Sequence, residues 1–502
     1  MNKVTAPQAL FRPALVLMAG RFLGFVAAFA IPVVLARVFN LQEFGTYKQL
    51  FLIVATLYGI AQCGMAESLY YFLPQESQRN GSYVFNTLVV LGSTGLLVLL
   101  MLWLWREEVA NLLNNPQLAA YLPMIGLYLL FTLLAVVLEI VMTVRRQHLA
   151  ASCSYAMSDL VRAVLLVLPV LWFADLYWLL AGALVFALLR VMAMRVYVMR
   201  QFGDQLHADA ATLKKHLGYA IPFGLAGLIE IVQTNFHLYA VSWFFDTATF
   251  AIYAVGCLQI PLVDFLMSST CNVMMVNMRE SSLAGDHDAV KAIWLDSIRK
   301  LALVFCPLVG VLLVTAQQLI VLLFTDTYSA SVPIFMVWTV SMLFATLLTD
   351  GALRVFAQTR FLILQNLVRL ALIAGLIQWF LQQYQLTGAI LVTLIATAVS
   401  KAMALARIKV VMALPFHSLL PWKQLAQTLL LATLAMLPAL LFKILFVDGV
   451  SGLFLLIGTG TIYTLSYYLL LQWFGPMQDD ERYMLSQWVL TPFLRLTARI
   501  KF

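Results

Sequence analysis

Residues 159–173 read DLVRAVLLVLPVLWF and residues 366–380 read NLVRLALIAGLIQWF, so that Leu, Val, Arg, Leu, Trp and Phe recur in register. The two stretches start 207 positions apart, and each places one arginine, Arg162 or Arg369, inside a long apolar segment. A second pair has almost the same offset, because FNLQEFGTY begins at position 39 and FDTATFAIY begins at position 245. Two matches at nearly equal offset predict a duplicated helical unit.

The composition indicates a membrane protein. Of the 502 residues, 63% are hydrophobic and 11% are charged, whereas a soluble globular protein has about a quarter charged residues. The apolar runs of roughly 20 to 28 residues are long enough to cross about 30 Å of hydrocarbon as helices. They lack the alternation of a membrane β-barrel. The net charge of +8 is spread over short loops, so it does not indicate a nucleic-acid-binding face. We therefore expect an all-α polytopic membrane protein.

We expect about fourteen transmembrane helices. With a cytoplasmic N-terminus, nearly all loop Lys and Arg residues fall on the cytoplasmic side, as the positive-inside rule requires. Both termini are then cytoplasmic. The expected spans are residues 13–39, 46–73, 83–105, 120–146, 149–173, 175–200, 216–245, 248–277, 292–325, 330–357, 361–383, 386–412, 422–447 and 450–474.

The repeat also predicts the domains. Six spans separate the copies, and because six is even, both copies cross the membrane in the same direction. This is a parallel repeat about a pseudo-twofold axis along the membrane normal. The expected parts are an N-lobe of spans 1–6 (1–200), a cytoplasmic linker (201–215), a C-lobe of spans 7–12 (216–412), spans 13 and 14 (413–478) and a cytoplasmic interfacial tail (479–502).

Several ionisable residues lie inside expected spans, where an unpaired charge costs several kcal/mol. Glu139 and Arg162 flank one cytoplasmic turn at similar depth, and Asp350 and Arg369 flank the equivalent turn of the second copy. These four charges predict an ion pair within each lobe, although the arginines are also candidates for contact with a substrate. Arg190 and Lys401 are further interior cations.

Four more charges lie on spans 1, 2, 7 and 8. Arg21 is a candidate anion-binding residue, a partner of Glu67, or a side chain that snorkels to the membrane surface. Glu230 and Asp264 lie near the middle of the membrane, where two acids can bind and release a coupling cation. They can equally be buried as protonated or hydrogen-bonded groups beside the polar residues Asn235 and His237.

Motifs for enzymatic chemistry are missing from the sequence. It contains no GxxxxGK[ST] loop, no HExxH and no CxxC pair, and each of these would carry a nucleotide, metal or redox site. We therefore expect no catalytic residues, no metal site and no cofactor.

The stretch ARVFNLQEFGTY at 36–47 resembles the short outer turn, ending in Phe-Gly-x-Tyr, of the polysaccharide-transporter branch of the multidrug/oligosaccharidyl-lipid/polysaccharide (MOP) exporter superfamily. The architecture of six, six and two spans resembles that family over the whole chain. The resemblance implies two lobes that open alternately to either side of the membrane. It also implies a central cavity lined by spans 1, 2, 7 and 8. Arg21, Glu67, Asn235 and His237 are then the candidate substrate-binding residues of this cavity, and Glu230 and Asp264 are its candidate ion-coupling residues.

The function that the resemblance implies is transport of an undecaprenyl-pyrophosphate-linked oligosaccharide across the bacterial inner membrane, coupled to an ion gradient. The expected partners are this substrate, membrane lipids, a polysaccharide polymerase and a chain-length regulator. The alternatives are a peptidoglycan-precursor flippase, a cation-coupled drug exporter, an integral-membrane glycosyltransferase or polymerase, and a passive channel or scaffold.

Overall fold

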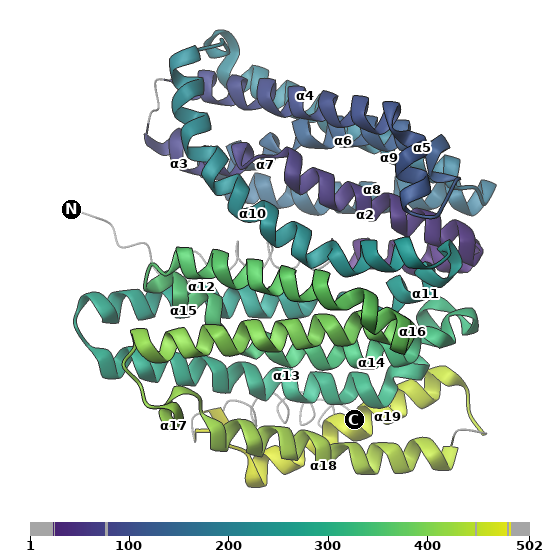
Figure 1. Cartoon of the computed structure of the whole chain (residues 1–502), viewed down its shortest axis with the longest axis vertical. Coiled ribbons are helices and arrows are strands. Elements are labelled where there is room, and N and C mark those ends of the chain that lie inside the picture. The colour runs from purple at the N-terminus through teal and green to yellow at the C-terminus, as the bar shows by residue number, and fades with distance from the viewer. Residues whose placement is uncertain (1–23, 25, 76–78, 447–448, 479–480, 483–502) are drawn as a thin grey trace, which may run out of the picture. The chain divides into compact units, whose positions relative to one another are not determined.

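The computed structural model describes residues 24, 26–75, 79–446, 449–478 and 481–482, and every regular element within them is a helix (Figure 1). Ten helices of this part are long and apolar enough to cross a membrane, or eleven when the bent pair Ala210–Pro222 and Gly227–Phe244 counts as one span. Val26–Val38 and Thr247–Gly256 are shorter apolar helices. The predicted all-α, multi-pass membrane fold is confirmed.

The predicted spans from the second onward each coincide with at least one helix. The eighth span is broken at 257–260, and the eleventh and twelfth form one helix that is kinked at Gln385. The first half of the chain contains α2 (Leu41–Ala61), α3 (Met65–Gln75), α4 (Asn80–Leu104), α5 (Arg106–Leu112), α6 (Leu118–Ala135), α7 (Val137–Val144), α8 (His148–Phe173), α9 (Leu176–Phe202), the 3-10 turn η2 (Gly203–Gln205), α10 (Ala210–Phe244) and α11 (Thr247–Gly256). The second half contains α12 (Pro261–Leu283), α13 (His287–Phe324), η3 (Asp326–Ser331), α14 (Val332–Ser341), η4 (Met342–Thr346), α15 (Thr349–Val355), α16 (Thr359–Val411), α17 (Phe416–Leu419), α18 (Trp422–Phe446) and α19 (Gly452–Phe474).

The chain divides into two compact units. Unit 1 comprises Met1–Cys257 and Asn366–Ala396, and unit 2 comprises Leu258–Gln365 and Thr397–Phe502. The boundaries of these units differ from those of the predicted lobes, 1–200 and 216–412. The division into lobes stays a prediction.

The helices α2 and α11 begin with the same kind of cap. The side chain of Asn40 accepts a hydrogen bond from the backbone N–H of Glu43 at 2.9 Å, and Asp246 accepts one from the N–H of Thr249 at 3.0 Å. Such caps satisfy backbone donors that the first helical turn leaves free. The two cap residues are 206 positions apart, which is the offset of the FNLQEFGTY echo. That echo therefore marks a structural repeat.

Helix ends show how far the repeat extends. Non-glycine residues with positive φ stand at three equivalent helix ends or kinks in each half: Asn114 and Thr325, Arg146 and Ala357, Ala174 and Gln385. The two members of each pair are 211 positions apart. The match between 159–173 and 366–380 has an offset of 207, which is four residues less than the structural offset of 211. Four residues are about one helical turn. An apolar helix matches itself well after a shift of one turn, because the same face is apolar again.

The predicted linker, 201–215, packs against α4 within unit 1. The hydroxyl of Ser82 is 3.0 Å from Nε2 of His207, and the side-chain amide of Asn86 donates to the carbonyl of Asp209 at 3.0 Å. A Cβ atom at Gly81 would lie 2.3 Å from the carbonyl oxygen of Gln205. A glycine is therefore needed where the two segments meet.

In unit 2, α18 and α19 pack on α13 through a core that includes Cys306, Ala435 and Tyr463. The Tyr463 hydroxyl donates to the carbonyl of Ala432 at 3.2 Å. A Cβ atom at Gly310 would lie 2.0 Å from that hydroxyl oxygen, so the close approach of α19 to α13 depends on this glycine. Spans 13 and 14 are thus firmly attached to unit 2.

Candidate functional site

A buried ion pair lies inside unit 1. Glu139 is in the first turn of α7, and its side chain is 1% exposed. Both terminal nitrogens of the Arg190 guanidinium, on α9, donate to its carboxylate, and the Nη2–Oε2 distance is 2.8 Å. The hydroxyl of Ser154, on α8, donates to Oε1 at 2.7 Å. A two-pronged pair with an added hydroxyl satisfies the charges that the membrane interior would otherwise penalise.

A second ion pair lies inside unit 2. Asp350 is in the first turn of α15, and its Oδ1 atom is 3.5 Å from Nζ of Lys401 on α16. Lys401 also donates to the hydroxyl of Thr349 at 2.9 Å, and the amide of Gln365 donates to Oδ1 of Asp350 at 3.4 Å. The Asp350 side chain is 50% exposed, so this pair is much more open than the pair in unit 1.

The two ion pairs are copies of one arrangement. Each member of the first has its counterpart 211 positions later: Glu139 and Asp350, Arg190 and Lys401, Ser154 and Gln365. In both copies the carboxylate stands in the first turn of a short helix, α7 or α15.

A second pair of equivalent hydrogen bonds involves the residues that directly precede α8 and α16. The side-chain oxygen of Gln147 accepts from the hydroxyl of Tyr197 at 2.6 Å, and that of Gln358 accepts from Nε of Arg407 at 3.0 Å. The two glutamines are again 211 positions apart. The duplication therefore preserves a polar network as well as a set of helices.

The predicted partners of the two acids were wrong. Arg162 pairs with Asp159 one turn earlier on α8, at 3.5 Å, and leaves Glu139 to Arg190. Lys401 takes the place that we predicted for Arg369 beside Asp350. With its amide turned so that both atoms find partners, Gln233 accepts from Arg369 at 3.0 Å. The sequence did contain the signal, because Arg190 and Lys401 are separated by the same 211 positions as the two acids.

The polar residues predicted near the cavity fall into two classes. Asn235 and His237 are engaged inside unit 1, since Asn235 donates to the hydroxyl of Thr56 at 3.0 Å and Nδ1 of His237 is 2.7 Å from the hydroxyl of Tyr253. Glu67 on α3, Glu230 on α10 and Asp264 on α12 are exposed. Within the described ranges these three carboxylates make no hydrogen bond or ion pair. Arg21 lies outside the residues that the structure describes.

A small cavity borders the ion pair of unit 1. Its volume is about 120 Å³, and Tyr58, Thr132 and Tyr155 line it together with Glu139 and Arg190. Because a water molecule occupies about 30 Å³ in the liquid, the cavity has room for a few waters beside the carboxylate. The arrangement can hold an ion pair stably with water beside it.

The family model described as "Polysaccharide biosynthesis protein" matches residues 34–333. Among solved structures, the chain is similar to a lipid II flippase, MurJ, in an inward closed conformation, with 13% identity, a TM-score of 0.71, and coverage of 92% of this chain and 98% of that one. It is also similar to an inward-facing multidrug resistance MATE family transporter of the MOP superfamily, with 10% identity, a TM-score of 0.60 and coverage of 78% and 96%.

A third similar structure is the MATE transporter VcmN of Vibrio cholerae in its bent form, with 12% identity, a TM-score of 0.53 and coverage of 81% and 98%. A search of curated proteins by sequence gave no match. At these identities the structural matches concern the fold. They extend over nearly the full length of each solved chain.

Proposed function

The chain belongs to the polysaccharide biosynthesis protein family, and we propose that it is a flippase for an undecaprenyl-pyrophosphate-linked oligosaccharide. Its family and its MOP-type fold agree with the resemblance drawn from the sequence. In this proposal it moves the lipid-linked sugar from the inner to the outer leaflet of the bacterial inner membrane, with both of its termini in the cytoplasm. The sugar then serves the assembly of O-antigen, capsule or exopolysaccharide.

One observation carries the proposal: a chain of a polysaccharide biosynthesis family has the fold of a lipid II flippase over 92% of its length. The physical need for such a protein is clear, because a charged, sugar-bearing head group cannot cross about 30 Å of hydrocarbon unaided. A polar path inside a helical membrane protein lowers this barrier while the polyprenyl tail stays in lipid.

The exposed carboxylates support a role in ion coupling. The sequence has no nucleotide-binding loop, so the direction of transport must come from an ion gradient, the membrane potential or removal of the product. Glu230 and Asp264 are exposed charges on long apolar helices, and exposed carboxylates in such helices are typical of ion pathways. We assign the coupling role to these two.

We assign the substrate contacts by asking which candidate side chains are exposed and which already have hydrogen-bond partners. Glu67 is exposed in the first turn of α3 and is free to accept hydrogen bonds from sugar hydroxyls. Asn235 and His237 are already bonded to Thr56 and Tyr253, so in this proposal they position α10 beside the path. Arg21 remains the proposed contact for the pyrophosphate.

The experiment is transport in proteoliposomes with a labelled undecaprenyl-pyrophosphate oligosaccharide. We expect Glu67→Gln, Glu230→Gln and Asp264→Asn each to slow transport at least tenfold. Glu108→Gln, which removes an exposed carboxylate elsewhere, should leave the rate unchanged. Full activity in all three variants would remove these residues from the proposed path.

A peptidoglycan-precursor flippase is the second candidate, because the solved structure with the TM-score of 0.71 is that of a lipid II flippase. The same proteoliposomes loaded with lipid II distinguish the two. We expect the oligosaccharide to be transported at least tenfold faster. A preference for lipid II would reverse the order of the candidates.

Enzymatic activity is not part of either proposal. A polysaccharide polymerase and a chain-length regulator are the proposed partners, and co-purification with the chain is their test.

A further inference from the structure

One end of unit 2 contains a large pocket, which we call the basic pocket. Its volume is about 850 Å³, which is in the range of small-molecule binding sites. The first turns of α13, the segment from α17 to the start of α18, and Gln478 form it. The lining residues used below are Lys291, Asp296, Arg299, His417, Trp422 and Lys423.

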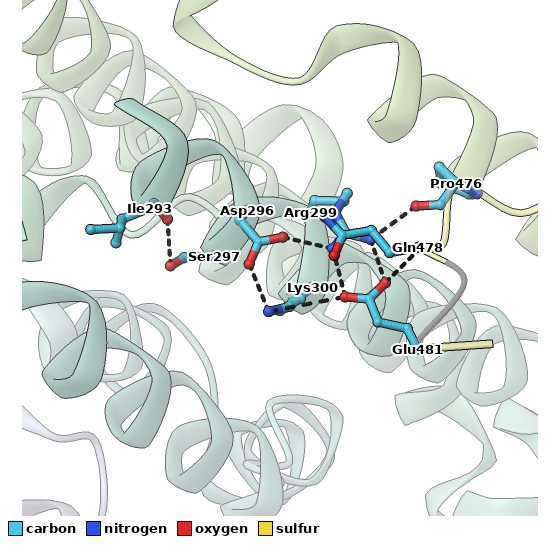
Figure 2. A network of polar contacts seen from close by, with 8 residues as sticks. All are labelled: Ile293, Asp296, Ser297, Arg299, Lys300, Pro476, Gln478 and Glu481. Atoms are coloured by element: carbon cyan, nitrogen blue, oxygen red, sulfur yellow. Dashed lines mark hydrogen bonds and ion pairs between the residues drawn. The ribbon is translucent and has the colours of Figure 1, made fainter. Parts of the chain in front are cut away.

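The charges beside the pocket largely cancel in one network (Figure 2). Arg299 donates through both terminal nitrogens to the carboxylate of Glu481, at 2.7 and 2.6 Å, and through Nη2 to Asp296 at 2.6 Å. Lys300 pairs with the other oxygen of Asp296 at 2.6 Å. Two cations and two anions thus neutralise one another.

Lys291 and Lys423 stand outside that network. Neither has an ion-pair partner in the part of the chain that the structure describes, and both line the pocket. His417 lines the pocket as well. The pocket therefore carries uncompensated positive charge and is suited to an anion.

Helix lengths place the pocket at the depth of lipid head groups. The charge-free stretch of α13, residues 301–324, contains 24 residues and is about 36 Å long, already more than the roughly 30 Å of hydrocarbon. Residues 287–300, which include Lys291, must then lie beyond the hydrocarbon. The charge-free stretch of α18, residues 424–442, is about 28 Å long by the same rise, so Lys423 also falls at its boundary.

Two aromatic side chains mark the same boundary. Phe416 and Trp422 are 63% and 43% exposed, and their ring centroids are 5.2 Å apart. The indole N–H of Trp422 donates to the carbonyl of Phe416 at 3.1 Å. The amphipathic rings of Trp and Tyr are enriched where head groups meet acyl chains, so Trp422 is the marker of this boundary and Phe416 packs beside it.

We propose that the basic pocket binds the phosphate of an anionic phospholipid from the surrounding leaflet. Lys291 and Lys423 would hold the phosphate, and the Phe416–Trp422 pair would flank the glycerol backbone. Basic pockets between transmembrane helices bind such head groups in other membrane proteins. The proposal is independent of the transported substrate and does not depend on the proposed function.

The test is native mass spectrometry of the full chain with phosphatidylglycerol and with the zwitterionic phosphatidylethanolamine. We expect the wild type to bind phosphatidylglycerol at least tenfold more tightly. Each lysine near an anionic head group contributes about fivefold in affinity, so Lys291→Gln/Lys423→Gln should weaken phosphatidylglycerol binding about 25-fold. The matched control, Lys214→Gln/Lys409→Gln, removes two exposed lysines outside the pocket and should change binding less than twofold.

Equal loss in both double variants, or no loss in either, would overturn the proposal. Inorganic pyrophosphate, tested on the same protein, should bind far more weakly than phosphatidylglycerol, and comparable binding would assign the pocket to soluble phosphates instead. If the double variant does not fold, Lys423→Gln, which changes one exposed side chain, should still weaken binding about fivefold.

Discussion

Loss of the carboxylate should affect the two duplicated ion pairs very differently. Glu139 and Arg190 are 1% and 17% exposed and share two hydrogen bonds. In Glu139→Gln the Arg190 guanidinium has no counter-charge inside the membrane. An arginine side chain stays protonated in proteins, so this charge cannot be removed. Removal of one partner of a buried pair costs about 3–5 kcal/mol, so we expect a loss of that size in the free energy of unfolding.

Asp350→Asn should cost much less. The Asp350 side chain is 50% exposed and meets Lys401 through a single contact at 3.5 Å. Lys401 keeps its hydrogen bond to Thr349, so its ammonium group retains one polar partner when the carboxylate is lost. An open pair of this kind is worth about 0–1 kcal/mol.

The assay is reversible unfolding in mixed micelles, read as a double-mutant cycle for each pair. Glu139→Gln/Arg190→Gln should recover much of the loss of Glu139→Gln, with a coupling energy near 3 kcal/mol. The cycle for Asp350→Asn and Lys401→Gln should give a coupling under about 1 kcal/mol. Equal couplings in the two cycles would refute the argument from burial.

Three further outcomes follow from single contacts. Gly310→Ala should destabilise unit 2 by about 1–3 kcal/mol, because the new methyl group meets the Tyr463 hydroxyl, and Tyr463→Phe should restore part of the loss in an unfolding titration. Asp246→Ala removes the cap of α11 and should cost about 1 kcal/mol in the same titration, whereas Asp326→Ala, which caps no helix through its side chain, should cost less. The hydrogen bonds from Arg299 lower the pKa of Glu481, so its contribution to stability is present at neutral pH and is lost as the pH falls below about 4.3 through the lowered pKa. The stability difference between wild type and Glu481→Gln should therefore shrink in acid, and a difference that grows as the pH falls would contradict this.

Much of the fold could be predicted from the sequence, because long apolar runs have few alternatives in a membrane. The echoes at 39 and 245 led to the capped starts of α2 and α11. The match between 159–173 and 366–380 is displaced from the structural register by one turn, since apolar helices match themselves at that shift. That register aligns Arg162 with Arg369, whereas the cations that pair with the two acids are Arg190 and Lys401.

The ion pairs and the basic pocket illustrate what the sequence could not supply. Depth along a helix can be counted from the sequence, but the face that a side chain presents to its neighbours depends on packing. The sequence shows Arg190 and Lys401 as interior cations, and only the fold places them beside Glu139 and Asp350. In the sequence, Lys291 and Lys423 are two loop cations among many, because residues of α13 and α18 meet at one pocket only in the folded chain.

The most direct test of the central claim is transport of a labelled undecaprenyl-pyrophosphate oligosaccharide by the purified chain in proteoliposomes. The proposed function predicts that the labelled head group becomes accessible in the opposite leaflet at a rate that depends on the protein and falls at least tenfold in Glu230→Gln. A rate equal to that of protein-free vesicles, with the chain folded and inserted, would contradict it.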